Sequence, residues 1–389
     1  MSRHRSRRMT ARALLVLATL QSALQGGCFG VRYVAQQAGG QLQLLRSRRH
    51  VDEVLRDPAT SPETRARLTL ALEARRFGIE QLGLRGGAEF TRFVDPGGPV
   101  AYNLVAAEAT RLRNLSWRFP FIGRVPYLGF FKRDDAVTTA KGLRQRGYDV
   151  DLRPVGAYST LGYFISPIYA SMLDDAGPDG EVRTVETILH EMAHSTVWLP
   201  GSDLNEGFAS LVGVQGAARF FRERGDLAQS ELAVTQAQEQ EQRARAFSAW
   251  FAPALDKVRA FYKKAELERH PRERILKERE AVFAELMQSY RAAFPKGPRY
   301  KRLAEGPISN ALLLSFGVYH GNDRIQEDLL ASVDGDLRAF VGLYKQALGT
   351  GGTAWLKQLV ADYRRTLPEP PARPAASDPG APPAPAPPG

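Results

Sequence analysis

Residues 186–213 read ETILHEMAHSTVWLPGSDLNEGFASLVG, and they decide how the rest of the chain is interpreted. Within them, His190, Glu191 and His194 form the pattern H-E-x-x-H. On a helix, positions i and i+4 share a face, so both imidazoles can reach one ion. Neutral imidazole is a common zinc ligand, and the intervening Glu191 can take a proton from water without binding the metal. The pattern predicts a zinc-binding helix; the alternative is a pair of surface or structurally satisfied histidines.

The residues after this motif supply a candidate third ligand. Pro200 and Gly201 end the first helix, and a second is expected to begin near Asn205, with Asn205 or Asp203 as its cap. Glu206 then falls in the first turn of an antiparallel helix, where it can face the same ion. Asp203 is the competing ligand, and Glu206 could instead only complement the helix dipole. Two histidines and Glu206 leave one coordination position open to water, as in a catalytic zinc site.

The remaining sequence predicts an α+β fold that is mostly helical. Residues 31–84 have apolar residues at helical spacing, with Ser61 as a helix cap and Pro62 at the first helical position. Frequent glycine, proline and aromatic residues predict strands and turns over 86–131. Further elements are expected as a helix ending near Gly147, an edge strand in 151–164, a charged helical hairpin at 217–247 and 251–294, a helix in 308–320, and two helices within 323–363.

The two ends of the chain differ in composition from the rest. Residues 1–12 hold five arginines and no acid, and the apolar run from Ala13 to Leu20 has the length of a signal-peptide core. Cys28, the single cysteine, follows two glycines, which predicts a lipoprotein signal over 1–27 and lipidation of Cys28, although the usual leucine lies one position too far back, at Leu24. The last residues, 367–389, are rich in proline and alanine and are expected to be disordered. One folded domain is therefore expected over 28–366.

The charge distribution argues against a nucleic-acid partner. The formal net charge is +11, and it falls to +6 without the five arginines of residues 1–12. No stripe of Lys and Arg interleaved with aromatic residues is present, so nucleic-acid binding is not expected. The predicted lipid anchor instead implies a membrane attachment and a place in the cell envelope, facing the periplasm.

A tyrosine upstream of the motif is a candidate for a second catalytic role. Tyr158 lies in the expected edge strand, and such a strand can line a cleft and pair with an extended peptide. Its hydroxyl could donate to the oxyanion of a tetrahedral intermediate. Tyr319 and His320 are alternative donors, and Tyr158 could equally be a core aromatic residue with a satisfied hydroxyl.

From about Cys28 to Tyr344, the chain resembles a bacterial family of predicted aminopeptidases, zinc peptidases of the HExxH class that are often lipoprotein-like. The resemblance is carried by CFGVRYVAQQAGGQLQLL from residue 28, WRFPFIGRVPYLGFF from 117, GLRQRGYDVDLRPVGAYSTLGYFISP from 142 and HEMAHSTVWLPGSDLNEGFASLVG from 190. It implies a zincin-like fold, with a small sheet before the metal helix and a helical lobe after it. It also implies zinc on His190, His194 and Glu206, with Glu191 as the general base, and supports Cys28 as the lipidated start.

The chain departs from that family at several positions. Arg118 and Arg124 stand where the family usually has two cysteines, which would form a disulfide; Ser166 replaces a common acidic residue, Ser195 a usual glutamine and Gly213 a frequent glutamate. None of these is an expected zinc ligand, so the departures concern the surroundings of the site and its substrate preference.

The expected function is therefore hydrolysis of peptide bonds in a peptide or protein substrate, with an aminopeptidase as the favoured type and an endopeptidase as an alternative with the same chemistry. The rival from another class is a non-catalytic envelope lipoprotein, a scaffold or peptide-binding protein with a structural metal site. A structural site would need a fourth protein ligand, and no cysteine or further histidine lies near the motif in the sequence.

Overall fold

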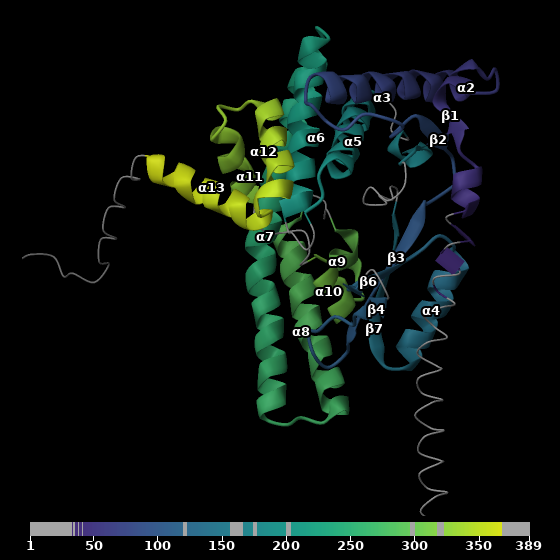
Figure 1. Cartoon of the computed structure of the whole chain (residues 1–389). Coiled ribbons are helices and arrows are strands. Elements are labelled where there is room, and N and C mark those ends of the chain that lie inside the picture. Colours follow the sequence, from purple (N-terminus) through teal and green to yellow (C-terminus); the bar gives the residue numbers. More distant parts are fainter. Residues whose placement is uncertain are drawn as a thin grey trace, which may run out of the picture.

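The structure is a computed structural model of the whole chain, and it describes residues 33, 36–37, 39–40, 42–119, 123–155, 166–173, 177–199, 204–295, 300–316 and 323–367. Helices account for most of the described residues, and the strands form small sheets, so the expected mostly helical α+β class is confirmed. Figure 1 shows a long helical hairpin at the centre, with the strands on one side of it and the C-terminal helices on the other.

The first elements are β1 (Arg49–His50), α2 (Val51–Arg56) and α3 (Pro62–Glu80). Helix α3 begins as expected, because the Ser61 hydroxyl accepts a hydrogen bond from the Thr64 amide at 3.1 Å and Pro62 occupies the first helical position. The buried face of α3 packs on α5, the helix that carries the H-E-x-x-H motif.

Three small sheets precede the motif. Their strands are β2 (Arg92–Val94), β3 (Ala101–Glu108), β4 (Trp117–Phe119), β5 (Gly123–Val125), β6 (Tyr127–Phe130), β7 (Tyr148–Val155) and β8 (Ile168–Tyr169). The largest sheet has the order β6-β3-β7 and is antiparallel, with Leu104 opposite both Leu128 and Leu152. The others have the orders β1-β2-β8 and β4-β5. Strand β7 lies at a sheet edge, as expected, and ends at Val155.

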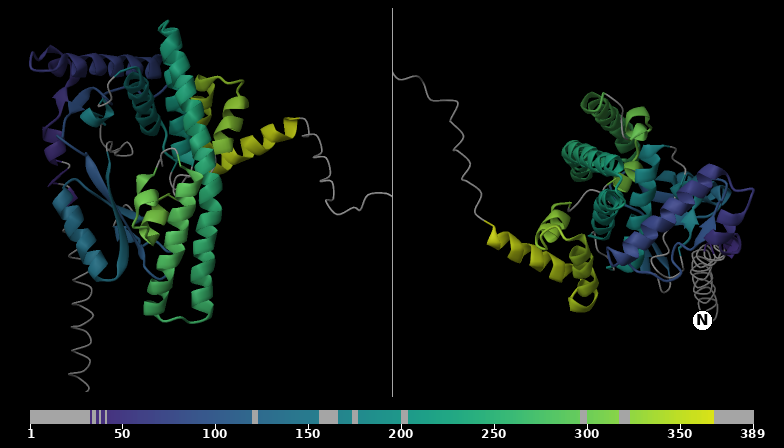
Figure 2. Two further views of the ribbon diagram at one scale, coloured as in Figure 1. Left: turned by 180° about the vertical axis from the view of Figure 1, so that it is seen from behind. Right: turned by 90° about the horizontal axis from the view of Figure 1, so that it is seen from above.

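Helices cover both faces of the β6-β3-β7 sheet. Helix α4 (Arg133–Gln145) contributes Ala136, Ala140 and Leu143 to an apolar cluster with the strands, and it ends just before Gly147, which has a positive φ of 81°. Helix α10 (Asn310–Phe316) contacts β3 and β7 as well, as the views of Figure 2 also indicate. The sheet is therefore buried between elements far apart in sequence.

Helices α5 (Pro178–Thr196) and α6 (Leu204–Glu223) pack extensively against each other, and the buried residues of both belong to the main core. Two glycines of α6 allow the close approach. A Cβ added at Gly213 would lie 2.8 Å from the Glu186 carbonyl oxygen, and one at Gly216 would lie 2.7 Å from Leu189 Cδ1. The pair therefore needs glycine at these positions to keep its spacing.

The charged helical hairpin exists, but its expected boundaries were wrong. Helix α7 (Leu227–Leu267) runs without a break through Pro253, and α8 (Arg272–Ala293) returns beside it, so the turn lies near residue 270 instead of 250 (Figure 1). Proline removes one helical hydrogen bond. Aromatic packing on either side holds the helix together, since the rings of Phe247 and Phe251 stack at 5.2 Å and Trp250 contacts Tyr290.

The C-terminal part contains three helices where two were expected. These are α11 (Asp323–Ala331), α12 (Leu337–Thr350) and α13 (Thr353–Thr366), and α9 (Lys301–Glu305) lies between α8 and α10. The extra break comes at Gly351 and Gly352, which both have positive φ, so α12 ends there with a left-handed cap. Across the described residues, no helix is long and apolar enough to span a bilayer.

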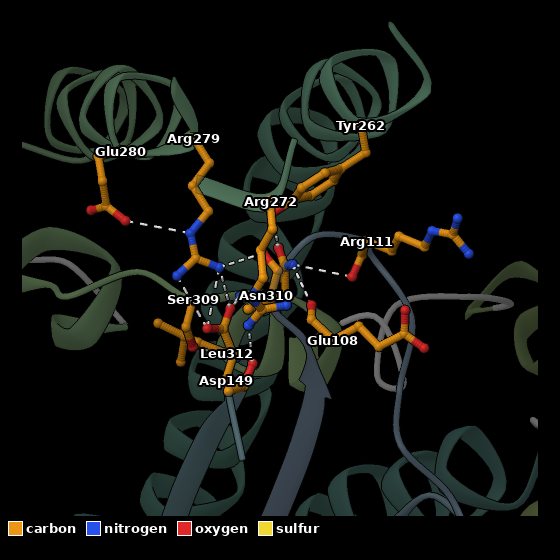
Figure 3. A network of polar contacts seen from close by, with 12 residues as sticks. Glu108, Arg111, Asp149, Tyr262, Arg272, Arg279, Glu280, Ser309, Asn310 and Leu312 are labelled. Atoms are coloured by element: carbon orange, nitrogen blue, oxygen red, sulfur yellow. Dashed lines mark hydrogen bonds and ion pairs between the residues drawn. The ribbon is translucent and has the colours of Figure 1, made fainter. Parts of the chain in front are cut away.

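A buried polar network joins the sheet to the hairpin (Figure 3). Arg279 of α8 donates to both carboxylate oxygens of Asp149 on β7, at 3.0–3.2 Å, and to the Ala109 carbonyl at 2.6 Å. The backbone amide of Asn310 also donates to Asp149, at 2.9 Å, and the side-chain oxygen of Asn310 accepts from the Tyr262 hydroxyl. These bonds link four elements that no local sequence signal connects.

Candidate metal centre

Helix α5 presents the motif on one of its faces. It begins at Pro178, with acidic Asp179 and Glu181 in its first turn, and its buried residues pack into the main core. His194 is buried and His190 is partly buried, with 5% and 24% of their side chains exposed. The helix therefore holds the two imidazoles at the edge of the core, where one side remains open.

The side chain of Asn205, in the first turn of α6, is hydrogen-bonded to Leu199, which follows the end of α5. Asn205 accepts a hydrogen bond from the Leu199 amide at 2.9 Å and donates to the Leu199 carbonyl at 2.8 Å, and it is buried. The sequence predicted Asn205 as a possible cap, whereas the helix begins at Leu204 and the Asn205 side chain makes both hydrogen bonds to Leu199. We call this pair of hydrogen bonds the Asn205 clasp. This clasp fixes where the first turn of α6, with Glu206, lies relative to the end of α5.

A second contact holds the same turn from the far side. Gln326 of α11 donates to the Leu204 carbonyl at 3.3 Å and accepts from the Tyr344 hydroxyl of α12 at 2.6 Å. A Cβ at Gly207 would lie 2.8–3.2 Å from Gln326, so this contact is tight. Sequence reasoning missed Gln326 and Tyr344, because a polar residue in a C-terminal helix carries no signal that it packs against residue 204.

Three side-chain donors converge where α5 and α6 meet. The Nε2 atoms of His190 and His194 are 3.1 Å apart, His194 Nε2 is 3.6 Å from Glu206 Oε1, and His190 Nε2 is 3.8 Å from Glu206 Oε2. Within the described part of the chain, the group that could hold a metal ion consists of these three residues. Glu206 therefore lies beside the imidazole pair.

The spacing of these atoms fits a zinc ion. Ligand atoms about 2.0–2.1 Å from a tetrahedral zinc lie roughly 3.3 Å apart. The three observed separations, 3.1, 3.6 and 3.8 Å, lie close to that value. The two separations from Glu206 are to different oxygens of its carboxylate, and each residue offers one atom that can donate an electron pair to a metal. The Glu206 side chain is half exposed. The arrangement is compatible with a metal that has an open coordination position.

The electrostatics hold His190 and Glu206 in the protonation states that a metal needs. Burial lowers the pKa of His190 to about 4, helped by the neighbouring His194 and opposed by Glu206, so this imidazole is neutral near neutral pH. Contact with His194 lowers the pKa of Glu206, which stays ionised despite partial burial. A neutral imidazole and an ionised carboxylate are the forms that bind zinc.

Glu191 has an environment different from that of Glu206. Burial raises the pKa of Glu191, with His194 acting against the shift and Glu206 adding to it. A carboxylate with a raised pKa is a stronger base than an exposed one, which is what proton transfer near neutral pH requires. Trp198 also flanks the site, with its ring 5.6 Å from that of His194.

Several sequence-predicted site residues lie outside the described residues. Tyr158 and the alternative donors Tyr319 and His320 are among them, as are Asp203 and Cys28. Their roles stay predictions. Within the described part of the chain, Nδ1 of His194 is buried without a hydrogen-bond partner.

The family departures can be located in part. Arg118 and Arg124 lie directly opposite each other on β4 and β5, which is where a cross-strand pair would stand. Ser166 is buried, and its amide donates to Glu89 at 2.6 Å. At Gly213 a side chain would meet the Glu186 carbonyl and the Cβ of His190. In this chain, α5 and α6 therefore pack closely at the position where the family often has a glutamate.

Helices α5 and α6 bring two histidines and a carboxylate together, which makes this chain a candidate metal-binding protein. The profile of the family described as "Putative aminopeptidase" matches residues 32–351, so the chain belongs to this family. No curated protein and no solved structure matches the chain.

Proposed function

We propose that this protein is a zinc-dependent peptidase that binds its metal through His190, His194 and Glu206. The observation that carries the proposal is the convergence of these three donors at 3.1–3.8 Å from two neighbouring helices. The family supports peptide substrates. A bound zinc ion would supply Lewis acidity, which acidifies a water and polarises the carbonyl of the substrate.

The residues of the chain perform the proton transfers. The Glu191 carboxylate takes a proton from the attacking water, whose oxygen forms a bond to the carbonyl carbon. The same carboxyl then delivers the proton to the amide nitrogen as the C–N bond breaks. The raised pKa of Glu191 suits both steps, because the group must bind and release a proton near neutral pH.

The proposal also includes a tyrosine as the donor to the oxyanion. Tyr158 is the favoured oxyanion donor, with Tyr319 and His320 as alternatives, on sequence grounds alone. Tyr158→Phe is expected to lower kcat by about 10²- to 10³-fold with little change in KM, the effect of removing one oxyanion donor. An unchanged kcat would exclude Tyr158 and leave the other two to be tested.

The non-catalytic alternative is not favoured. A structural zinc site is closed by a fourth protein ligand, whereas the group within the described residues has three members and a half-exposed carboxylate. The raised pKa of Glu191 is also of no use to a structural site. An endopeptidase would use the same chemistry with a different pocket.

The decisive experiment is Glu191→Gln, measured for zinc content and for hydrolysis of a peptide library. The variant is expected to keep its zinc and to lose about 10²- to 10⁴-fold in kcat/KM, because only the base is removed. Glu181→Gln, on the same helix but hydrogen-bonded to Gln229, serves as the matched control and should leave both quantities unchanged. Full activity of Glu191→Gln would exclude the base role, and absence of zinc from the wild type would exclude the metal.

The location is proposed from residues 1–28 alone. Export to the envelope and lipidation of Cys28 would tether the domain to a membrane and turn it toward the periplasm. Mass spectrometry of the N-terminal fragment tests this: an acylated Cys28 at the mature start is expected, and Cys28→Ser should release the protein from membranes. An unmodified Cys28 within a longer mature chain would overturn the anchor.

A further inference from the structure

A cavity of about 570 Å³ lies between α5 and α7, on the N-terminal side of the metal cluster. Its wall on α5 includes Asp179, Arg183, Glu186 and Thr187, and its wall on α7 extends from Leu232 to Arg243. Residues 183, 186 and 187 continue through 190 and 194 along one face of a helix. The cavity therefore lies along the same face of α5 as the imidazoles.

Glu186 and Thr187 are the cavity residues of α5 that are nearest to the metal cluster in the sequence, and Glu186 carries the charge. It lies one turn before His190, and a Cβ placed on Gly213 would be 3.4 Å from Glu186 Cγ and 3.2 Å from His190 Cβ. The two side chains thus lie next to each other against the same point of α6. Because both lean toward the N-terminus of α5, their ends are separated by about 6 Å along the helix axis.

The acidic groups of the cavity differ in how they are satisfied. Asp179 accepts a hydrogen bond from Gln236 at 2.7 Å, and Glu239 forms an ion pair with Arg243 at 2.9 Å. Glu186 is partly buried and makes no hydrogen bond or ion pair within the described part of the chain, and the charge of Arg183, which lines the same cavity, attracts it. The effect of burial on this carboxylate outweighs that attraction, so a cationic ligand would be stabilised beside it.

Two contacts between the helices lie at the end of the cavity away from the metal cluster. Gln236 of α7 donates to Asp179, and Gln229 donates to Glu181 at 2.7 Å, so α7 is held against the first turns of α5. A peptide that extends along α5 from the metal cluster would meet these contacts beyond Glu186. They favour a peptide that ends in the cavity over one that continues through it.

Resting on the proposed peptidase function, we propose that Glu186 binds the free α-amine of the substrate and that the α5–α7 cavity holds its first residue. The spacing along α5 is compatible with a single residue. An extended residue spans about 3.3–3.6 Å, and a charge-assisted hydrogen bond from an ammonium to Glu186 adds about 2.8 Å. Together these lengths are close to the rise of about 6 Å that a helix makes between residues 186 and 190.

The test compares trialanine amide with its N-acetyl derivative, for the zinc-loaded wild type and Glu186→Gln. The wild type is expected to prefer the free amine by about 10- to 100-fold in kcat/KM, the range for a hydrogen bond between charged groups, and to release alanine first. Glu186→Gln should lose most of this preference while keeping its zinc and its melting temperature. Glu285→Gln on α8, where the side chain is 65% exposed and lies outside the cavity, should retain the preference.

Binding provides a second readout that does not depend on turnover. Calorimetry on the zinc-loaded Glu191→Gln protein should show the same preference for trialanine amide, and adding Glu186→Gln should remove it. If the preference persists without Glu186, or the wild type treats both peptides alike, the anchor is overturned and the peptidase stands. If neither peptide nor any other is hydrolysed, the peptidase proposal fails, and calorimetry alone decides the anchor.

Discussion

Two buried polar clusters of this protein are built in opposite ways. In the cluster around Asp149, the Arg279 guanidinium and the Asn310 amide both donate to the carboxylate, so donors meet acceptors (Figure 3). In the cluster around His190, two ring nitrogens and a carboxylate face one another within 3.1–3.8 Å, and all three can act as acceptors.

The difference separates a structural cluster from a candidate functional one. Opposite charges pair at Asp149 and Arg279, whose side chains are only 9% and 13% exposed, and the buried Nε of Arg279, which makes no hydrogen bond, lies 3.4 Å from Glu280. At the imidazole pair, His194 can donate one hydrogen bond through Nε2, and the acceptors that remain there favour a bound cation. Each cluster therefore predicts a different response to mutation.

The largest effect on stability is expected from breaking the balanced cluster. Arg279→Met leaves Asp149 buried without its cation and should lower the free energy of unfolding by about 3–5 kcal/mol, measured by urea denaturation. Glu280→Gln is the control, because Glu280 contacts Arg279 with a side chain that is 68% exposed, and it should change stability by less than about 1 kcal/mol. Zinc content of the folded Arg279→Met protein should be unaffected. A stability loss below 1 kcal/mol would show that the network contributes little.

Removing a donor from the open cluster should instead change metal binding. Zinc bound by protein side chains gains about 10–16 kcal/mol over a full ligand set, so Glu206→Ala should weaken zinc affinity by about 100- to 1,000-fold. The stability of the metal-free protein should change by no more than about 1 kcal/mol, since Glu206 is half exposed and only complements the helix start. Competition with a chromogenic chelator measures the first quantity, and thermal unfolding the second. Unchanged zinc affinity would mean that Glu206 serves the helix dipole alone.

Removal of the metal tests the same difference between the two clusters. Zinc that binds only the folded protein should add about 2.7 kcal/mol of stability when its free concentration is 100 times Kd. Dialysis against a chelator should therefore lower the melting temperature of the wild type, and added zinc should restore it. The Glu206→Ala protein should show a much smaller shift under the same conditions. An equal shift in both proteins would locate the stabilising metal elsewhere.

A smaller loss of stability than at Arg279 is expected at the helix contact that sets the donor spacing. Gly213→Ala places a methyl 2.8 Å from the Glu186 carbonyl, so α5 and α6 must separate, and the free energy of unfolding should fall by about 1–3 kcal/mol. Zinc affinity should fall with it, because the imidazoles and Glu206 lie on different helices. Gly342→Ala on α12 is the control: no atom lies within 4 Å of the added Cβ, and a gain of about 0.5–1 kcal/mol is expected. A neutral Gly213→Ala would mean that the helix pair adapts freely.

Much of the local structure could be predicted because it depends on neighbouring residues. The Ser61–Pro62 start of α3 and the end of α4 before Gly147 follow from capping and turn chemistry. The hairpin turn was misplaced because Pro253 normally ends a helix, and the aromatic packing that overrides it involves residues from α8. The third C-terminal helix was missed although Gly351 and Gly352 marked the break.

By itself, the sequence determined which side chains can bind a metal: helical periodicity puts His190 and His194 on one face, and Pro200 and Gly201 require a turn before Glu206. Only the tertiary structure decided how these groups meet. The Asn205 clasp and the Gln326 contact fix the first turn of α6, and the packing of α7 on α5 encloses Glu186 beside His190. Such placements depend on many weak contacts between residues far apart in the chain, whereas helix starts and faces depend on residues a few positions away.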